Sequence, residues 1–181
     1  MDTANIERYL NSFGKQVVKE SKGNLQKAKG NTTVGNSIRF EVVKENSGYS
    51  TKFYMEDYGT YLDKGVSGTK TKRKYTDHEG RKVSTPYKYT TKGPPIDILS
   101  KWIKKKGIKP KGLGRGRDKK TGQFVSGFAY LISRKIKREG IKSLSFFQEP
   151  LGIEYKKLNK DLLNIITADI RTYITTFYRP K

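Results

Sequence analysis

The stretch Ser37–Asp57, SIRFEVVKENSGYSTKFYMED, decides the fold class of this chain. Apolar and polar residues alternate on both sides of a central Asn-Ser-Gly. Such alternation is typical of a strand with one buried face, and Asn, Ser and Gly are turn residues. The stretch therefore predicts an antiparallel β-hairpin, with strands over Ser37–Lys44 and Tyr49–Asp57.

Helical periodicity flanks this hairpin on both sides. Apolar residues recur every three or four positions before the hairpin and again in the second half of the chain. Glycines and prolines mark the ends of these segments. Four helices are predicted. The first is capped by Asp2 or Thr3 and ends at Gly30, and the second follows Pro94-Pro95. The third covers Phe124–Glu139, and the fourth covers Leu158–Phe177, after an interruption at Pro150. After the hairpin, Tyr58–Gly65 is predicted as a short aromatic turn closed by glycine. A small antiparallel sheet with helices packed against it is an α+β fold, and 181 residues fit a single domain over 1–181.

Composition excludes several classes of protein. The chain contains no Cys, which rules out disulfide frameworks, cysteine-based zinc sites and cysteine nucleophiles. The first residues are polar, and no apolar run approaches the roughly 18 residues that a membrane span needs. We therefore expect a soluble protein with no membrane partner.

Positive charge is concentrated in the middle of the sequence. The whole chain has 39 Lys and Arg against 17 Asp and Glu, a net charge of +22. The segment Lys64–Lys142 holds 24 basic and five acidic residues, so that +19 of this charge lies within it. Such a segment favours a polyanionic partner, above all nucleic acid, whose phosphates release counterions when they are neutralised.

Two basic loops are predicted within this segment. The first, 66–93, lacks sustained periodicity and is expected as a long loop or an extended hairpin. Its tyrosines, interleaved with cations, suit stacking on single-stranded bases or packing against a neighbouring subunit, and the sequence leaves both open. The second, 107–122, is rich in Gly and Lys but lacks the Gly-Lys-Ser/Thr ending of a phosphate-binding P-loop. The residues predicted to contact DNA or subunits are Lys70, Lys72, Arg73, Lys74, Arg81, Lys82, Lys88, Lys104, Lys105, Lys106, Arg115, Arg117, Lys119 and Lys120.

A catalytic role has little support in the sequence. His78 is the single histidine and lies in a polar turn, where a structural or solvated role is expected. Four acids on or beside the hairpin offer the ligand type that Mg²⁺ prefers, and Glu154-Tyr155-Lys156 has a spacing found in metal-dependent nucleases. These acids are Glu41, Glu56, Asp57 and Asp63. A nuclease is therefore a minor alternative, and we predict no enzyme, catalytic residue, cofactor or metal.

Several ordered motifs resemble one family. The run Tyr58-Gly59-Thr60-Tyr61-Leu62-Asp63-Lys64-Gly65-Val66 follows a hairpin and an N-terminal helix. This arrangement resembles the head–tail connector, or tail-completion (neck), proteins of tailed bacteriophages. The matching residues are Tyr58, Tyr61, Leu62, Asp63 and Gly65. Further on, Gly122–Val125, Arg134–Ile136, Gly140–Lys142 and Phe146–Pro150 are similar to the C-terminal half of such proteins, whereas 66–93 is longer and more basic than their pattern.

The resemblance implies a structural virion protein without enzymatic activity. Such proteins form a homo-oligomeric ring at the head–tail junction, beside portal, connector or tail proteins, with DNA in the lumen. By this resemblance the chain would be made in the bacterial cytoplasm and end in the virion. The alternative that the residues themselves support is a free-standing, non-specific nucleic-acid-binding protein.

Overall fold

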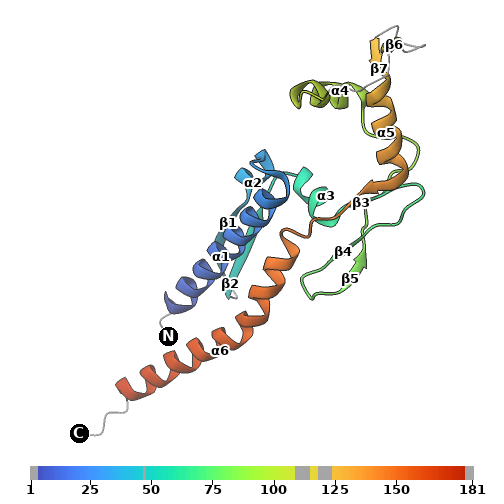
Figure 1. Ribbon diagram of the computed structural model, residues 1–181. Helices are drawn as coiled ribbons and strands as arrows, with labels where there is room; N and C mark the ends of the chain where they lie inside the picture. The colour runs from blue at the N-terminus through green and yellow to red at the C-terminus, as the bar shows by residue number, and fades with distance from the viewer. Residues whose placement is uncertain (1–3, 47, 109–114, 118–123, 178–181) are drawn as a thin grey trace. The chain divides into compact units, whose positions relative to one another are not determined.

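The structure is a computed structural model that describes residues 4–46, 48–108, 115–117 and 124–177 (Figure 1). The chain divides into two compact units. Unit 1 comprises Met1–Asp63, Thr76–Val83 and Leu144–Lys181, and unit 2 comprises Lys64–Tyr75 and Ser84–Ser143. We expected one domain over 1–181. The segment after Asp63 makes its own internal contacts before the chain returns to unit 1 at Thr76.

Unit 1 is built on a long helix packed against the predicted hairpin. Helix α1 (Ala4–Lys29) buries one face through Leu10, Phe13 and Val17, at the spacing that predicted it. Strands β1 (Arg39–Glu45) and β2 (Gly48–Tyr54) pair antiparallel, as predicted, and α1 lies against them (Figure 1). Gly14 permits this close approach, because a Cβ there would lie 2.2 Å from the ring of Phe40.

Two short helices frame the hairpin. Helix α2 (Thr33–Ser37) is capped by Thr32, whose hydroxyl accepts a hydrogen bond from the Gly35 N–H at 3.0 Å. The predicted aromatic turn is instead helix α3 (Tyr58–Lys64). Its buried residues are Gly59, Leu62 and Asp63, and the spacing of three and four from Gly59 places them on one side of a helix. Gly65, at φ +70°, ends it as expected.

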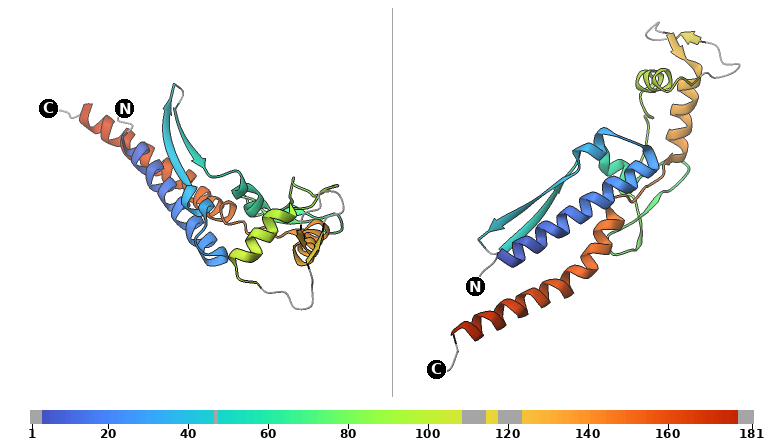
Figure 2. Two further views of the ribbon diagram at one scale, coloured as in Figure 1. Left: turned by 90° about the horizontal axis from the view of Figure 1, so that it is seen from above. Right: turned by 60° about the vertical axis from the view of Figure 1, so that its left-hand side comes forward.

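The last helix is longer than the sequence predicted. Helix α6 spans Gln148–Phe177 and runs beside α1, as the right-hand view of Figure 2 shows. The predicted interruption at Pro150 is wrong, because this proline lies in the first turn, where its missing N–H costs no helical hydrogen bond.

The core of unit 1 joins α1, α2, β2, α3 and the start of α6. An edge-to-face aromatic cluster lies at its side, with the Phe53 ring 6.2 Å from Phe13 and 5.4 Å from Phe147 between centroids. The buried residues of the whole hydrophobic core are Phe13, Val17, Leu25, Val34, Ile38, Leu62, Phe146 and Phe147. A small antiparallel sheet with helices against it confirms the α+β class.

Unit 2 contains two helices and several short strands. Helix α4 (Ile96–Lys105) begins after Pro95, as predicted. Helix α5 (Gly127–Glu139) starts three residues later than expected, because Phe124–Ser126 forms strand β7 and pairs with β6 (Arg115–Arg117). Strand β3 (Val66–Ser67) pairs with β8 (Gly140–Ile141). The predicted loop 66–93 contains a short hairpin of strands β4 (Lys74–Thr76) and β5 (Lys82–Ser84), whose turn belongs to unit 1. The rest of 66–93, apart from β3, is irregular.

Candidate nucleic-acid interface

The charge asymmetry of the sequence coincides with the division into units. Unit 2 holds 22 basic and three acidic residues, a net charge of +19, whereas unit 1 holds 17 and 14, a net charge of +3. The polycationic character of the chain therefore belongs to one compact unit. Neutralising phosphates is the chemistry that such a unit suits best.

The predicted basic residues differ in how free their charges are. Most of the lysines are exposed. Arg73 is half-buried, and its Nε donates to the Glu139 carbonyl at 2.8 Å. The exposed lysines of the predicted set are Lys70, Lys72, Lys74, Lys82, Lys88, Lys104, Lys105 and Lys106. Arg115 and Arg117 lie on β6, whereas Lys119 and Lys120, with most of the predicted loop 107–122, lie outside the described residues.

The start of the 66–93 segment is anchored to the end of α5. The backbone N–H groups of Thr69 and Lys70 donate to the carbonyls of Lys137 and Arg138, both at 2.9 Å. The last carbonyls of a helix have no partner inside the helix, so these bonds, with the one from Arg73, satisfy three of them. The segment is thus held firmly at this point.

Residues 84–89 run alongside this segment. The Ser67 N–H donates to the Tyr87 carbonyl at 2.8 Å, and the Tyr89 N–H donates to the Ser67 carbonyl at 2.9 Å. The Thr85 hydroxyl adds a bond to the Gly65 carbonyl at 2.8 Å. Residues 65–73 and 84–89 therefore form one hydrogen-bonded frame.

Two glycines allow this frame to pass close to the end of α5 and the start of β8. A Cβ on Gly68 would lie 2.2 Å from the Arg138 carbonyl oxygen. Gly140 has φ +74°, and a Cβ there would lie 2.1 Å from the Val66 carbonyl oxygen. The sequence indicated Gly140 as a helix stop and as part of the family-like run Gly140–Lys142, and nothing in the pattern identified Gly68.

A cavity of about 590 Å³ opens between the two sides of this frame, residues 65–73 and 84–89. Lys70, Lys72 and Lys88 line it, together with hydroxyl-bearing residues and Tyr89. The lysines were predicted as contacts, and Tyr89 was noted among the interleaved tyrosines. The hydroxyls of Thr69 and Thr71 were missed, although the Thr-Lys-Thr-Lys run Thr69–Lys72 was a visible signal.

The residues of the family-like motif divide into structural and exposed groups. Leu62 lies in the core, and the Asp63 carboxylate accepts the Phe147 N–H at 2.8 Å. Gly65 occupies a backbone conformation that favours glycine. Tyr58 and Tyr61 are exposed, with their ring centroids 6.4 Å apart. Three of the five positions thus have a clear folding role here.

His78 lies at the tip of the β4–β5 hairpin and contacts α6. Its ring stands edge-on to Tyr155, with the centroids 6.2 Å apart, and its carbonyl oxygen would lie 2.2 Å from a Cβ on Gly152. Beside it, burial alone would raise the pKa of Asp77, but hydrogen bonds from the Arg81 N–H and guanidinium outweigh this and lower it. Arg81 is therefore committed to the turn, and also pairs with Glu79 at 2.6 Å.

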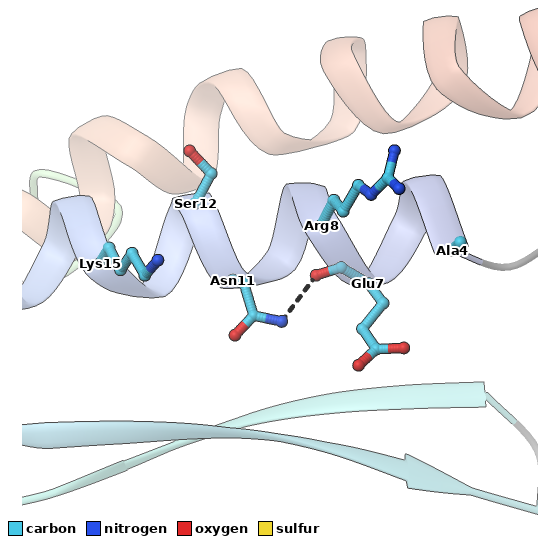
Figure 3. A pocket seen from close by; sticks show the side chains of 6 residues that line it. All are labelled: Ala4, Glu7, Arg8, Asn11, Ser12 and Lys15. Carbon is cyan, nitrogen blue, oxygen red and sulfur yellow. Dashed lines mark hydrogen bonds between the residues drawn. The ribbon is translucent and has the colours of Figure 1, made fainter.

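Two hollows lie among the described residues of unit 1. An apolar groove of about 640 Å³ lies between α1, the β1–β2 hairpin and α6, with His78 and Tyr155 at its side. Figure 3 shows a recess on one face of α1, whose lining mixes both signs of charge. The lining residues of this recess are Ala4, Glu7, Arg8, Asn11, Ser12 and Lys15.

The acids considered for a metal site are not brought together. Within the described residues there is no group of three or more His, Cys, Asp or Glu side chains placed to hold a metal ion. Glu41 accepts from the Tyr54 hydroxyl at 3.4 Å, and Asp63 is engaged at the start of α6. Glu154 pairs with Lys157 at 3.0 Å.

Comparisons with family models, curated proteins and solved structures give no match to this chain. The resemblance to phage connector proteins therefore remains a prediction based on the ordered motifs. Among the helices in the described part of the chain, none is long and apolar enough to cross a membrane.

Proposed function

We propose that this chain is a structural virion protein of a tailed phage, which assembles without catalysis into a ring around the DNA channel at the head–tail junction. The observation that carries the proposal is the net charge of +19 confined to unit 2. A ring repeats this charge around its circumference, which suits a channel through which DNA passes. The ordered motifs that resemble connector proteins give the proposal its particular place in the virion.

Exposed apolar side chains along α6 support assembly with other chains. Ile153 and Leu163 are 58% and 65% exposed, and Ile170 and Ile174 are also exposed. Single exposed apolar residues are ordinary, but a series along one helix favours a protein neighbour. This feature favours an assembling protein over a free-standing monomer.

The test is to measure assembly and location together. Light scattering after size-exclusion chromatography and negative-stain electron microscopy of the purified protein should show closed rings. Antibody labelling of virions should place the chain at the junction. A protein that stays monomeric at high concentration and is absent from particles would overturn the proposal.

A non-specific nucleic-acid-binding protein is the second candidate. The same charge asymmetry favours it, and it predicts tight, salt-dependent binding of DNA or RNA by the isolated monomer. Tight binding by a monomer, combined with the absence of rings, would select this candidate. A nuclease ranks below both, and Mg²⁺-dependent cleavage abolished by Asp57→Ala or Glu56→Ala would be needed to revive it.

A further inference from the structure

We propose that the cavity lined by Lys70, Lys72 and Lys88 is a binding site for the phosphodiester backbone of nucleic acid. This inference rests on the proposed function, because it assumes that unit 2 meets DNA. It goes further by assigning the contact to one built site and not to the charge of the whole unit.

The cationic groups at the cavity are free to meet an anion. Lys70, Lys72 and Lys88 are exposed, and none forms an ion pair within the described part of the chain. The lining contains no acidic residue. Three uncompensated ammonium groups around one hollow create a positive potential that attracts phosphate.

The walls of the cavity supply groups other than charge. The hydroxyls of Thr69 and Thr71 make no hydrogen bond to another described residue, and both residues line the cavity. Hydroxyls are regular donors to phosphate oxygens. Tyr89 lies in the same lining and offers an aromatic ring at the site. This combination of ammonium, hydroxyl and aromatic groups matches a nucleotide unit better than it matches an acidic peptide.

Backbone hydrogen bonds hold the frame around the cavity in place. Its two sides are joined by the bonds of Ser67 with Tyr87 and Tyr89, and one side is tied to the end of α5. A site that is already ordered loses less entropy on binding than a mobile loop does. The three lysines are therefore presented from a hydrogen-bonded backbone.

The experiment compares variants that lose equal charge at different places. The site variant is Lys70→Gln/Lys72→Gln/Lys88→Gln. The α4 variant is Lys104→Gln/Lys105→Gln/Lys106→Gln, in the same unit. The control is Lys19→Gln/Lys22→Gln/Lys27→Gln, on the exposed side of α1 in unit 1. Circular dichroism verifies that each variant is folded, and fluorescence anisotropy with a 30-nucleotide DNA gives Kd over a range of salt concentrations.

We expect the site variant to bind at least tenfold more weakly and to lower the slope of log K against log[salt] by about 2 to 3, since each phosphate contact contributes about 0.7 to 0.9. The control should stay within about twofold of the wild type. Thr69→Val/Thr71→Val should weaken binding by about three- to tenfold with the slope unchanged, because it removes donors and no charge. That last variant separates a built site from general attraction.

Each contrary result has a distinct meaning. If the α4 variant loses as much affinity as the site variant, the charge acts diffusely and the cavity proposal is overturned, while DNA binding by unit 2 stands. If poly-glutamate competes as well as DNA and the site variant loses both, the cavity is a seat for acidic protein and the proposal is again overturned. If the wild type binds no nucleic acid, the DNA-facing part of the proposed function fails as well.

Discussion

Asp63 links the family-like motif to the start of α6, and its replacement provides the sharpest test of how unit 1 is held together. The side chain is only 3% exposed. Its Oδ1 accepts the Phe147 N–H at 2.8 Å and the Gln148 N–H at 3.4 Å. The carboxylate thus caps α6 from a distant part of the sequence, at the helix end that favours negative charge.

The cost of removing this cap follows from its geometry. An ordinary capping side chain contributes about 0.5–2 kcal/mol, and a hydrogen bond to a charged group about 1.5–3 kcal/mol. The short bond to the Phe147 N–H dominates, since the longer one adds little. We therefore expect Asp63→Ala to lower the free energy of unfolding by about 2–3 kcal/mol. Asp63→Asn keeps an acceptor oxygen and should cost about 1 kcal/mol.

Urea unfolding followed by circular dichroism at 222 nm measures these losses, because α6 is a large part of the helical signal. Fluorescence of Trp102, the single tryptophan, follows unit 2 separately. The Asp63 variants should shift the dichroism transition more than the fluorescence transition. Asp57→Asn removes the same charge at an exposed position and should be nearly neutral. An Asp63→Ala loss below about 0.5 kcal/mol would refute the capping role.

Three further predictions follow from the contacts of unit 1. Gly152→Ala should destabilise the protein by about 1–3 kcal/mol, because the new methyl meets the His78 carbonyl, whereas Gly23→Ala, in open space on α1, should stabilise it by up to about 1 kcal/mol; thermal melts compare the two. Tyr9→Phe should cost about 1 kcal/mol near neutral pH by removing the 3.0 Å bond to Asp161. Burial raises the pKa of Tyr9 from 10.0 to about 12, and the hydrogen bond to Asp161 adds to this effect. The stability that Tyr9 contributes is therefore present below pH 10 and is lost as pH rises through 12. Unfolding measured at pH 8 and at pH 12 checks this. Asp77→Asn should lower stability at neutral pH, and the difference from the wild type should shrink as pH falls through the lowered pKa of Asp77, because protonation removes the charge that the Arg81 guanidinium pairs with; urea unfolding at a series of pH values from 7 downward is the measurement.

The hairpin and most helices were predictable because their signals are local. Alternation fixed β1 and β2, and apolar spacing fixed α1. Periodicity failed where a distant residue decides the structure. The first turn of α6 contains a proline, and its cap comes from Asp63, 84 residues away from Phe147 in sequence. A pattern confined to neighbouring residues carries no information about such a partner.

The candidate site was predictable in composition but not in geometry. Lysines and tyrosines of 66–93 indicated a polyanion contact, yet the cavity exists because residues 65–73 and 84–89 lie side by side. The close approaches at Gly68 and Gly140, which fix the first of these stretches against the end of α5, likewise have meaning only in three dimensions. The division into two compact units likewise depends on which segments return to each other.

The distribution of arginine and lysine within 66–93 bears on the kind of recognition that this segment supports. Arginine has a planar fork that reads guanine edges bidentately, whereas lysine acts as a point charge. Both arginines of this segment are already engaged, Arg73 with the Glu139 carbonyl and Arg81 with Asp77 and Glu79. The cations left for a partner in this segment are lysines, which favours contact with phosphate over readout of bases. A channel that passes DNA of every sequence requires this kind of contact.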